Sequence, residues 1–338
     1  MVVISLLTLV PGVSGGSETY VRELLPRLDG SHGLRVLLPP AASDAAGRLP
    51  ATVVDRFRGP RPLALARAAL GRKLTGADAV HYPLTVPVPR TSAPTIVTLH
   101  DLQHRDLPQL FSRVERAYRS LTYDGAARHA DRVIVVSEFV RGRALDLLGL
   151  DPARVRVTPL GLDHASLRPS NAEREPFLLY PARPWPHKNH RTLYEALPLI
   201  RRERPELRLV LTGGGDFGRV PDGVEVLGHV PRPRLVELLQ RASALVFPSL
   251  YEGFGLPPLE AMACGCPVAC SNAAALPEVV GDAARLFDPR SPEEIAAAVL
   301  DVLAGPAPWI ERGLACAARY SWDETARLTE AVYAELVP

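Results

Sequence analysis

Short apolar runs alternate with stretches of helical periodicity along almost the whole chain. In the first half the runs are residues 2–10, 34–38, 79–82, 95–99, 133–136 and 155–157. In the second half they are residues 177–180, 207–211, 224–227, 244–247 and 284–287. Runs of this length that are separated by helices predict strands of a parallel sheet with helices on both faces. The sequence therefore predicts an α/β fold built from doubly wound, Rossmann-like sheets.

The length of the chain predicts two such domains rather than one. A chain of 338 residues exceeds the size at which one hydrophobic core usually stops growing. The segment 161–175 is polar and irregular, as expected of a linker. We therefore expect an N-terminal domain over residues 1–165 and a second domain over 166–320. Residues 321–338 are expected to form a last helix, starting near Tyr320 and Trp322.

Composition excludes several classes of function. The net charge of +2 leaves no dominant basic field, so nucleic acid is not an expected partner. No apolar run is long enough to span a membrane, and residues 2–10 lack the basic region that precedes a signal peptide core. The four cysteines are too few for a disulfide framework in a chain this long, and we expect small buried thiols. A reducing cytoplasm is the expected compartment.

The strongest local pattern lies between Ser249 and Val268. The run 244–247 predicts a buried strand that ends at a proline, and Gly253 and Gly255 follow it in a loop. Pro257 and Pro258 suit the first turn of a helix. Glu252 lies on the loop and Glu260 lies in the helix, eight residues later. A glycine loop, a helix N-terminus and two carboxylates at the carboxyl end of a strand predict a site for an anion and a sugar.

This stretch, Glu-Gly-Phe-Gly-Leu-Pro-Pro-Leu-Glu-Ala-Met-Ala-Cys-Gly-Cys-Pro-Val, resembles the Glu-x7-Glu signature of the retaining glycosyltransferases of family 4. That family consists of two-domain enzymes of the GT-B type. The resemblance implies a nucleotide-sugar donor that is a co-substrate, with no cofactor. It also implies that Glu252 is catalytic and that Glu260 binds the nucleotide. The intervening residues expected to line the donor site are Phe254, Gly255 and Leu256.

Two cations in the second half are expected to bind the donor diphosphate. Arg183 and Lys188 flank a loop that precedes an amphipathic helix, and they resemble the Arg-x4-Lys element of the family. Lys188 is one of only two lysines in the chain, the other being Lys73. Cations near a helix N-terminus would neutralise a diphosphate. In the first half, the glycine loop after the first strand holds Gly15 and Gly16, and it resembles the Gly-Gly-x-Glu element of the same family.

Four further residues are candidates for the site. His100 follows the run 95–99 and resembles the family's His-Asp element, which is seen especially among mannosyltransferases. Ser137 is predicted to be a helix N-cap, and it also matches a position near the donor. Gly213 and Val230 lie at turns expected to line the nucleotide. The glycines of 213–218 match a dinucleotide fingerprint in form, but the next run, 224–227, leaves no room for the helix that this fingerprint requires.

These features predict a metal-independent retaining hexosyltransferase, because no Asp-x-Asp element is present to bridge a metal and a diphosphate. The expected donor is a GDP- or UDP-hexose, with GDP-mannose favoured slightly. The acceptor is an unidentified hydroxyl of a glycan, glycolipid or natural product. The alternatives are a sugar-nucleotide epimerase or a phosphorylase of the same fold, and an inactive nucleotide-sugar-binding subunit. A phosphorylase would need a lysine that binds pyridoxal. The two candidates are Lys73 and Lys188, and Lys188 is already assigned to the diphosphate.

The sequence leaves the oligomeric state and any membrane contact open. Two groups of arginines suggest a peripheral contact with the inner membrane face or with a lipid-linked acceptor. The first group is Arg56, Arg58, Arg61, Arg67 and Arg72, and the second is Arg113, Arg116 and Arg119. The alternative interpretation is that both groups are solvated helix faces.

Overall fold

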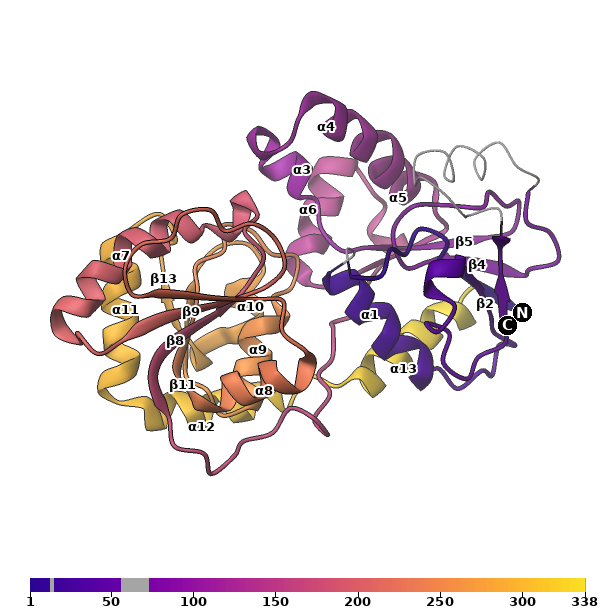
Figure 1. Ribbon diagram of the computed structural model, residues 1–338. Coiled ribbons are helices and arrows are strands. Elements are labelled where there is room, and N and C mark those ends of the chain that lie inside the picture. Colours follow the sequence, from indigo (N-terminus) through magenta and orange to yellow (C-terminus); the bar gives the residue numbers. More distant parts are fainter. Residues whose placement is uncertain (13–14, 56–72, 338) are drawn as a thin grey trace. The chain divides into compact units, whose positions relative to one another are not determined.

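A computed structural model describes residues 1–12, 15–55 and 73–337 of the chain. It divides into two compact units, one of Met1–Gly161 with Trp322–Pro338, and one of Leu162–Ser321. Each unit is a layered α/β structure around its own parallel sheet (Figure 1). The predicted fold class, two doubly wound Rossmann-like domains, is thereby confirmed. The arginines expected between residues 56 and 72 lie outside the described residues.

The first unit contains a seven-stranded sheet of order β3-β2-β1-β4-β5-β6-β7, in which every pairing is parallel. Its strands are β1 (Val2–Ser5), β2 (Arg35–Leu38), β3 (Ala51–Val53), β4 (Ala79–Tyr82), β5 (Thr95–Leu99), β6 (Arg132–Val135) and β7 (Val155–Val157). The central strands are buried along their whole length, as the runs rich in valine and isoleucine predict. The strand order reverses between β1 and β4.

The second unit repeats the plan with six parallel strands in the order β10-β9-β8-β11-β12-β13. They are β8 (Glu175–Pro181), β9 (Arg208–Thr212), β10 (Val224–Gly228), β11 (Ala242–Phe247), β12 (Val268–Ser271) and β13 (Arg285–Phe287). Here the order reverses between β8 and β11, which pair directly through Leu178 with Ala244 and Leu179 with Leu245. Ligands of open α/β sheets bind beside such a reversal, at the carboxyl ends of the strands.

Helices cover both faces of each sheet. In the first unit they are α1 (Gly16–Leu24), α3 (Gln103–Asp106), α4 (Arg113–Arg119), α5 (Gly125–His129), α6 (Glu138–Leu148) and α13 (Trp322–Ala334). In the second unit they are α7 (His190–Glu203), α8 (Arg232–Arg241), α9 (Leu256–Ala263), α10 (Leu276–Val280), α11 (Pro292–Ala304) and α12 (Pro306–Ala317). Helix α7 packs on α11, and α12 packs on α9; in the first unit the C-terminal α13 lies beside α1 (Figure 1). None of the helices described here is long and apolar enough to cross a bilayer.

Two strand predictions in the first unit were wrong in detail. Residues 2–10 were expected to form one strand, but β1 ends at Ser5 and a turn closed by Leu9 N and Leu6 O follows. After Ser5, Leu6 N still donates to the carbonyl of Leu37 in β2, and the chain then turns, although Leu6 and Leu9 stay buried. The short edge strand β3 was not predicted, because its three exposed residues form no apolar run.

A neutral polar network lies inside the first unit. His81 of β4 is fully buried, with Nδ1 2.8 Å from Tyr333 Oη and Nε2 2.8 Å from Thr98 Oγ1. Tyr20 Oη of α1 lies 3.3 Å from the same threonine hydroxyl. Burial lowers the pKa of His81 to about 3, so the imidazole stays neutral in the folded chain. The network ties α1 and α13 to the centre of the sheet.

The network predicts a loss of stability on mild acidification. The pKa of His81 is lowered from its ordinary value of 6.5 to about 3 in the folded chain. Between these two pH values, the unfolded chain binds a proton that the folded chain does not. The free energy of unfolding should therefore fall as the pH drops below 6.5, by up to about 1.4 kcal/mol per pH unit for this group. In His81→Gln that contribution should disappear. Hydrogen exchange of the β4 and β5 amides at pH 6.5, 5.5 and 5.0 measures it.

The exposed His129 of the same unit supplies the control. His129→Gln should keep the pH dependence of the unaltered chain. If the free energy of unfolding depended equally on pH in the His81 variant and in the unaltered chain, the imidazole would not be neutral and buried.

Candidate functional site

The two loops that follow β8 and β11 hold five of the residues predicted for the site: Arg183, Lys188, Glu252, Phe254 and Gly255. Both begin at carboxyl ends of strands that flank the reversal of the second sheet. Lys188 closes a short 3-10 segment in the first loop, and Glu252 lies in the second. Lys188 Nζ is 2.6 Å from Glu252 Oε1, and each side chain is only 14% exposed. The structure therefore brings together two predicted site residues that are far apart in the sequence.

Backbone and side-chain hydrogen bonds connect the same two loops. Leu250 N donates to the carbonyl of His187 at 2.8 Å. Asn189 Nδ2 donates to the carbonyl of Pro248 at 3.1 Å and to that of Pro289 at 2.6 Å. Asn189 has a φ of 60°, a left-handed conformation that asparagine adopts more readily than most residues. Asn189 thus turns the chain from the Lys188 segment into α7 while holding the opposite loop.

Two fully buried hydroxyls lie beneath the Lys188–Glu252 pair. Ser249 Oγ donates to Glu252 Oε1, the oxygen that also accepts from Lys188. Tyr180 Oη, at the end of β8, donates to the carbonyl of Lys188 at 2.6 Å. Burial raises the pKa of Tyr180 well above its ordinary value, so this hydroxyl remains a donor. Sequence reasoning singled out neither residue; the position of Ser249 three residues before Glu252 was the only available signal.

The second carboxylate of the signature has a different partner. Glu260 lies inside α9 and is 8% exposed. Its Oε1 accepts from Arg232 Nη1, 2.6 Å away, at the first residue of α8. The two carboxylates of the signature thus have different partners. Glu252 pairs with Lys188, and Glu260 pairs with Arg232, which was not predicted from the sequence.

The glycine loop after β9 lies against the loop that holds Arg183. Gly213 has a φ of 131°, and a Cβ there would lie 2.9 Å from the Ala182 carbonyl. Only glycine permits this approach. The Arg183 guanidinium lies 5.5 Å from the centre of the Trp185 ring. Residues 213–223 contain bends and turns but no helix, so the structure lacks the helix that the dinucleotide fingerprint requires. Val230 is half-buried in the loop after β10.

The predicted donor-lining residues of the signature surround the start of α9. Gly255 is the N-cap, with a φ of 107°, and a Cβ there would lie 2.6 Å from Leu276. Phe254 is buried and meets the Tyr320 ring edge-on, with 5.6 Å between the centroids. Leu256 is the first residue of the helix. The signature therefore builds a rigid glycine turn that leads into a helix N-terminus.

In the first unit, His100 lies just past the end of β5 and is half-buried. Its Nε2 is 2.8 Å from the carbonyl of Pro83, and its ring meets Tyr20 edge-on at 5.1 Å. Burial is the main reason that the pKa of His100 is lowered. A carbonyl only accepts, so Nε2 must carry the hydrogen and Nδ1 the lone pair of a neutral ring.

The other first-unit candidates lie at helix starts. Gly15 is the N-cap of α1 with a φ of 57°, and Gly16 is its first residue. Ser137 is the N-cap of α6, and its Oγ accepts from Val140 N at 3.1 Å. The capping role predicted for Ser137 is confirmed.

The cysteines do not contribute to the site. All four are free and buried, as expected for small structural thiols. They are Cys264, Cys266, Cys270 and Cys316. Burial raises the pKa values of the first three above their ordinary range, which disfavours the reactive thiolate. In the described parts of the chain, no cluster of three or more histidine, cysteine, aspartate or glutamate side chains could hold a metal ion.

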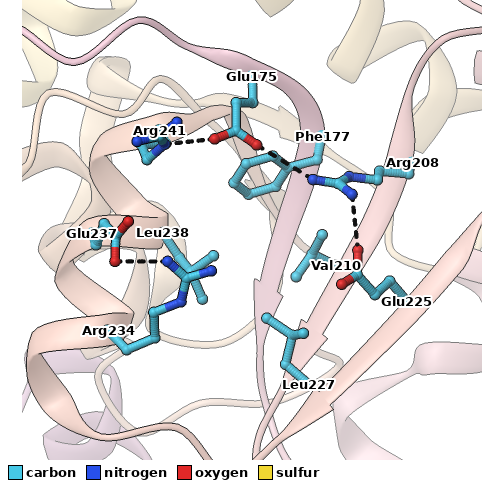
Figure 2. Close-up of a pocket in the computed structure, with 10 residues that line it drawn as sticks. All are labelled: Glu175, Phe177, Arg208, Val210, Glu225, Leu227, Arg234, Glu237, Leu238 and Arg241. Atoms are coloured by element: carbon cyan, nitrogen blue, oxygen red, sulfur yellow. Dashed lines mark hydrogen bonds and ion pairs between the residues drawn. The ribbon is translucent and has the colours of Figure 1, made fainter.

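A pocket of about 210 Å³ lies elsewhere in the second unit, near the amino ends of β8 and β9 (Figure 2). Figure 2 shows its acidic and basic side chains joined in pairs: Glu175 contacts Arg208 and Arg241, and Arg208 also contacts Glu225. Phe177 is among its apolar lining residues. None of the predicted site residues lines this pocket, and its charges neutralise one another. We therefore assign the functional site to the loops at the opposite ends of these strands.

Two family models match the chain in tandem. The model described as Glycosyltransferase Family 4 matches residues 14–166, and the model described as Glycosyl transferases group 1 matches residues 165–319. The chain is 31% identical over 283 residues to O-antigen chain mannosyltransferase B of Escherichia coli, which covers 76% of this chain and 74% of that protein. It is 32% identical to the MMP alpha-(1->4)-mannosyltransferase of Mycolicibacterium hassiacum, over 62% of this chain and 56% of that protein.

Solved structures agree in fold. A sucrose-phosphate synthase from Thermosynechococcus elongatus superposes with a TM-score of 0.74 at 21% identity, covering 99% of this chain and 98% of the other. Anabaena HepE in complex with UDP-glucose also superposes with a TM-score of 0.74, at 18% identity, covering 98% and 99%. With the family models and the mannosyltransferase relatives, these findings lead to one assignment: the chain is a glycosyltransferase of family 4, mannosyltransferase-like and with the GT-B fold.

Proposed function

We propose that the protein transfers a hexose from a nucleoside-diphosphate sugar to a hydroxyl acceptor, with retention of the anomeric configuration and without a metal ion. The observation that carries the proposal is the Lys188–Glu252 pair at the reversal of the second sheet. It joins one cation and one carboxylate where open α/β sheets bind ligands. A nucleotide-sugar donor is supported by the structure of HepE in complex with UDP-glucose, and a mannosyl donor by the names of two relatives.

The donor diphosphate would be neutralised by the loop after β8. Lys188 is expected to exchange Glu252 for a phosphate oxygen, and Arg183 is expected to bind the same group. The N-termini of α7 and α9 follow the two loops directly and add partial positive charge. In the first unit, Gly15 and Gly16 are expected to present the N-terminus of α1 in the same way. Together these groups stabilise the charge that develops as the diphosphate leaves.

Glu252 is expected to stabilise the sugar as the bond between its anomeric carbon and the diphosphate oxygen breaks. Positive charge develops on the sugar at this stage, and a carboxylate would stabilise it. The leaving diphosphate is a good leaving group, so no carboxylic acid has to protonate it, unlike the leaving group of a glycosidase. The acceptor hydroxyl attacks from the face that the diphosphate leaves and gives its proton to the departing phosphate oxygen. The configuration at the anomeric carbon is thereby retained.

Glu260 is proposed to bind the nucleotide, and His100 is proposed to bind the sugar. Arg232 orients the Glu260 carboxylate, which is expected to accept hydrogen bonds from the ribose hydroxyls. His100 is neutral, and its Nδ1 lone pair is suited to accept a hydrogen bond from a sugar hydroxyl. Phe254, Gly255, Leu256, Gly213 and Val230 are expected to line the nucleotide and sugar, with Ser137 near the donor.

The first prediction from this mechanism separates the two carboxylates. Glu252→Gln should lower kcat by roughly 10²-fold or more while the donor KM changes little, because it removes charge that matters in the transition state. Glu260→Ala should mainly raise the donor KM. Initial rates at varied donor concentration measure both effects, and Glu237→Gln, in an exposed ion pair with Arg234, serves as the control.

Product analysis and metal removal test the same mechanism. Proton NMR of the glycoside should show the anomeric configuration of the donor, and activity should persist in EDTA. An inverted product, or a Glu252→Gln enzyme of normal turnover, would overturn the assignment of Glu252. Release of free epimerised nucleotide sugar without an acceptor would favour the epimerase alternative instead.

The second prediction concerns Ser249 as a positioning residue for Glu252. Ser249→Ala removes a hydrogen bond to the catalytic carboxylate, so kcat should fall by roughly 10-fold, the equivalent of about 1.4 kcal/mol. The donor KM should change little. Ser243→Ala removes another serine hydroxyl of the same unit, one that donates to the carbonyl of Glu175, and should leave kcat unchanged. A matching loss in both variants would indicate a general structural effect.

The third prediction concerns the donor. Thermal shift assays should show stabilisation by GDP-mannose, because a ligand that binds only the folded chain stabilises it by about 2.7 kcal/mol at 100 times its Kd. Glu260→Ala should reduce this shift at the same donor concentration. Stabilisation by UDP-hexoses alone, with no response to any GDP-hexose, would show that the preference for GDP-mannose is wrong.

A further inference from the structure

One tryptophan is exposed within the loop that carries the predicted diphosphate ligands. Trp185 lies between Arg183 and Lys188 in the sequence and is 44% exposed. It is the most exposed of the three tryptophans of the chain, since Trp322 is buried and Trp309 is half-buried. A single exposed apolar side chain is ordinary on a protein surface, so the surroundings of Trp185 decide whether it has a function.

The backbone of Trp185 is fixed by the loop. A proline precedes the tryptophan and another follows it, and proline restricts the backbone φ. Trp185 N donates to the carbonyl of Arg183 at 2.7 Å, and Lys188 N donates to the carbonyl of Trp185 at 2.9 Å. The ring of Pro184 lies against the glycine loop, because a Cβ on Gly215 would lie 2.9 Å from its Cδ. The loop therefore presents the tryptophan from a preformed backbone.

The indole ring of Trp185 has polar neighbours. The Arg183 guanidinium lies 5.5 Å from the centre of the indole, and the His187 ring lies 5.8 Å from it at an interplanar angle of 35°. A flat apolar surface beside hydrogen-bonding side chains suits a ligand that has an apolar face and a polar edge. A pyranose ring has this character, because its C–H bonds form apolar patches on its faces and its hydroxyls lie around the edge.

The order of groups in the donor limits which substrate can lie on this ring. A nucleotide sugar contains, in order, a base, a ribose, a diphosphate and a hexose. The proposed function assigns the ribose to Glu260 and the hexose to Glu252. The base is attached to the ribose, so it lies away from the diphosphate that Arg183 is expected to bind. The position beside Arg183 therefore suits the acceptor, whose hydroxyl has to approach the leaving phosphate oxygen.

We infer that Trp185 is a stacking surface for the acceptor, and that the acceptor is a carbohydrate whose pyranose ring packs on the indole. The inference rests on the proposed function, and it adds the chemical class of the acceptor. Burial of the apolar face of the pyranose contributes affinity. The fixed backbone of the loop keeps the bound ring next to the diphosphate ligands, where one of its hydroxyls can reach the anomeric carbon.

Steady-state kinetics with GDP-mannose as donor and methyl α-mannoside as acceptor test the inference. Trp185→Ala should raise the acceptor KM by about 10-fold, the equivalent of 1.4 kcal/mol, because it removes the stacking surface. The donor KM should stay unchanged. Trp185→Phe keeps an aromatic ring and should recover most of the acceptor affinity. The matched control is Trp309→Ala in α12, since Trp309 also has an arginine over its ring, Arg312 at 4.4 Å, and both KM values should stay unchanged.

Binding measured without transfer separates this inference from the proposed function. Tryptophan emission is recorded while methyl α-mannoside, methyl α-glucoside or glycerol is added to the chain in the presence of GDP or UDP. The methyl glycosides should change the emission of the unaltered chain. Glycerol has hydroxyls but no ring, and it should have no effect. Trp185→Phe should remove the response to the glycosides, whereas Trp309→Phe should keep it.

The outcomes distinguish the two proposals. A glycoside response that depends on Trp185, in a chain that transfers no sugar, would support the stacking surface and contradict the proposed transfer reaction. No response to either glycoside, or an unchanged response in Trp185→Phe, would overturn the inference. A Trp185→Ala chain in which the donor KM rises in place of the acceptor KM would also overturn it, because the indole would then bind the donor.

Discussion

The ion pair between Lys188 and Glu252 is the contact on which the organisation of the candidate site depends. The two residues are 64 positions apart, and they meet because β8 and β11 pair directly at the reversal of the sheet. The pair alone would be a weak constraint, since partly exposed ion pairs contribute little stability. Its geometry is set by the hydrogen bonds of Leu250, Asn189, Ser249 and Tyr180, which fix the two loops before any ligand arrives.

This arrangement has a chemical consequence for donor binding. A cation and a carboxylate that are both 14% exposed have lost much of their hydration, and their mutual attraction compensates for this loss. A diphosphate that takes over Lys188 would leave the carboxylate of Glu252 to interact with the positive charge that develops on a sugar. A neutral ligand carries no negative charge to replace Glu252 at Lys188, so the ion pair disfavours the binding of neutral ligands. The hydroxyl of Ser249 would remain on Glu252 throughout and keep it oriented.

Much of the fold was predictable because parallel strands that are buried on both faces form continuous apolar runs. Strands β4, β5 and β7 have the predicted bounds, whereas β1 is shorter because a turn follows it. Residues of the candidate site were predictable where a local motif marked them, as at Glu252 and Glu260. Arg232 and Tyr180 were not, because they reach the site through tertiary contacts and no local pattern marks them.

The candidate residues of the two units have hydrogen-bonding partners of different charge. In the first unit, His81 is hydrogen-bonded to Tyr333 and Thr98 and His100 donates to a carbonyl, although this unit also buries Asp124 as the partner of Arg105. The second unit places charged pairs beside its glycine turns, at Glu252 and Glu260. Leaving-group charge is stabilised by cations, whereas a neutral imidazole nitrogen offers a lone pair to a hydroxyl without adding charge. With its hydrogen on Nε2, the neutral His100 keeps an acceptor lone pair at Nδ1, whereas the cations of the second unit pair with carboxylates.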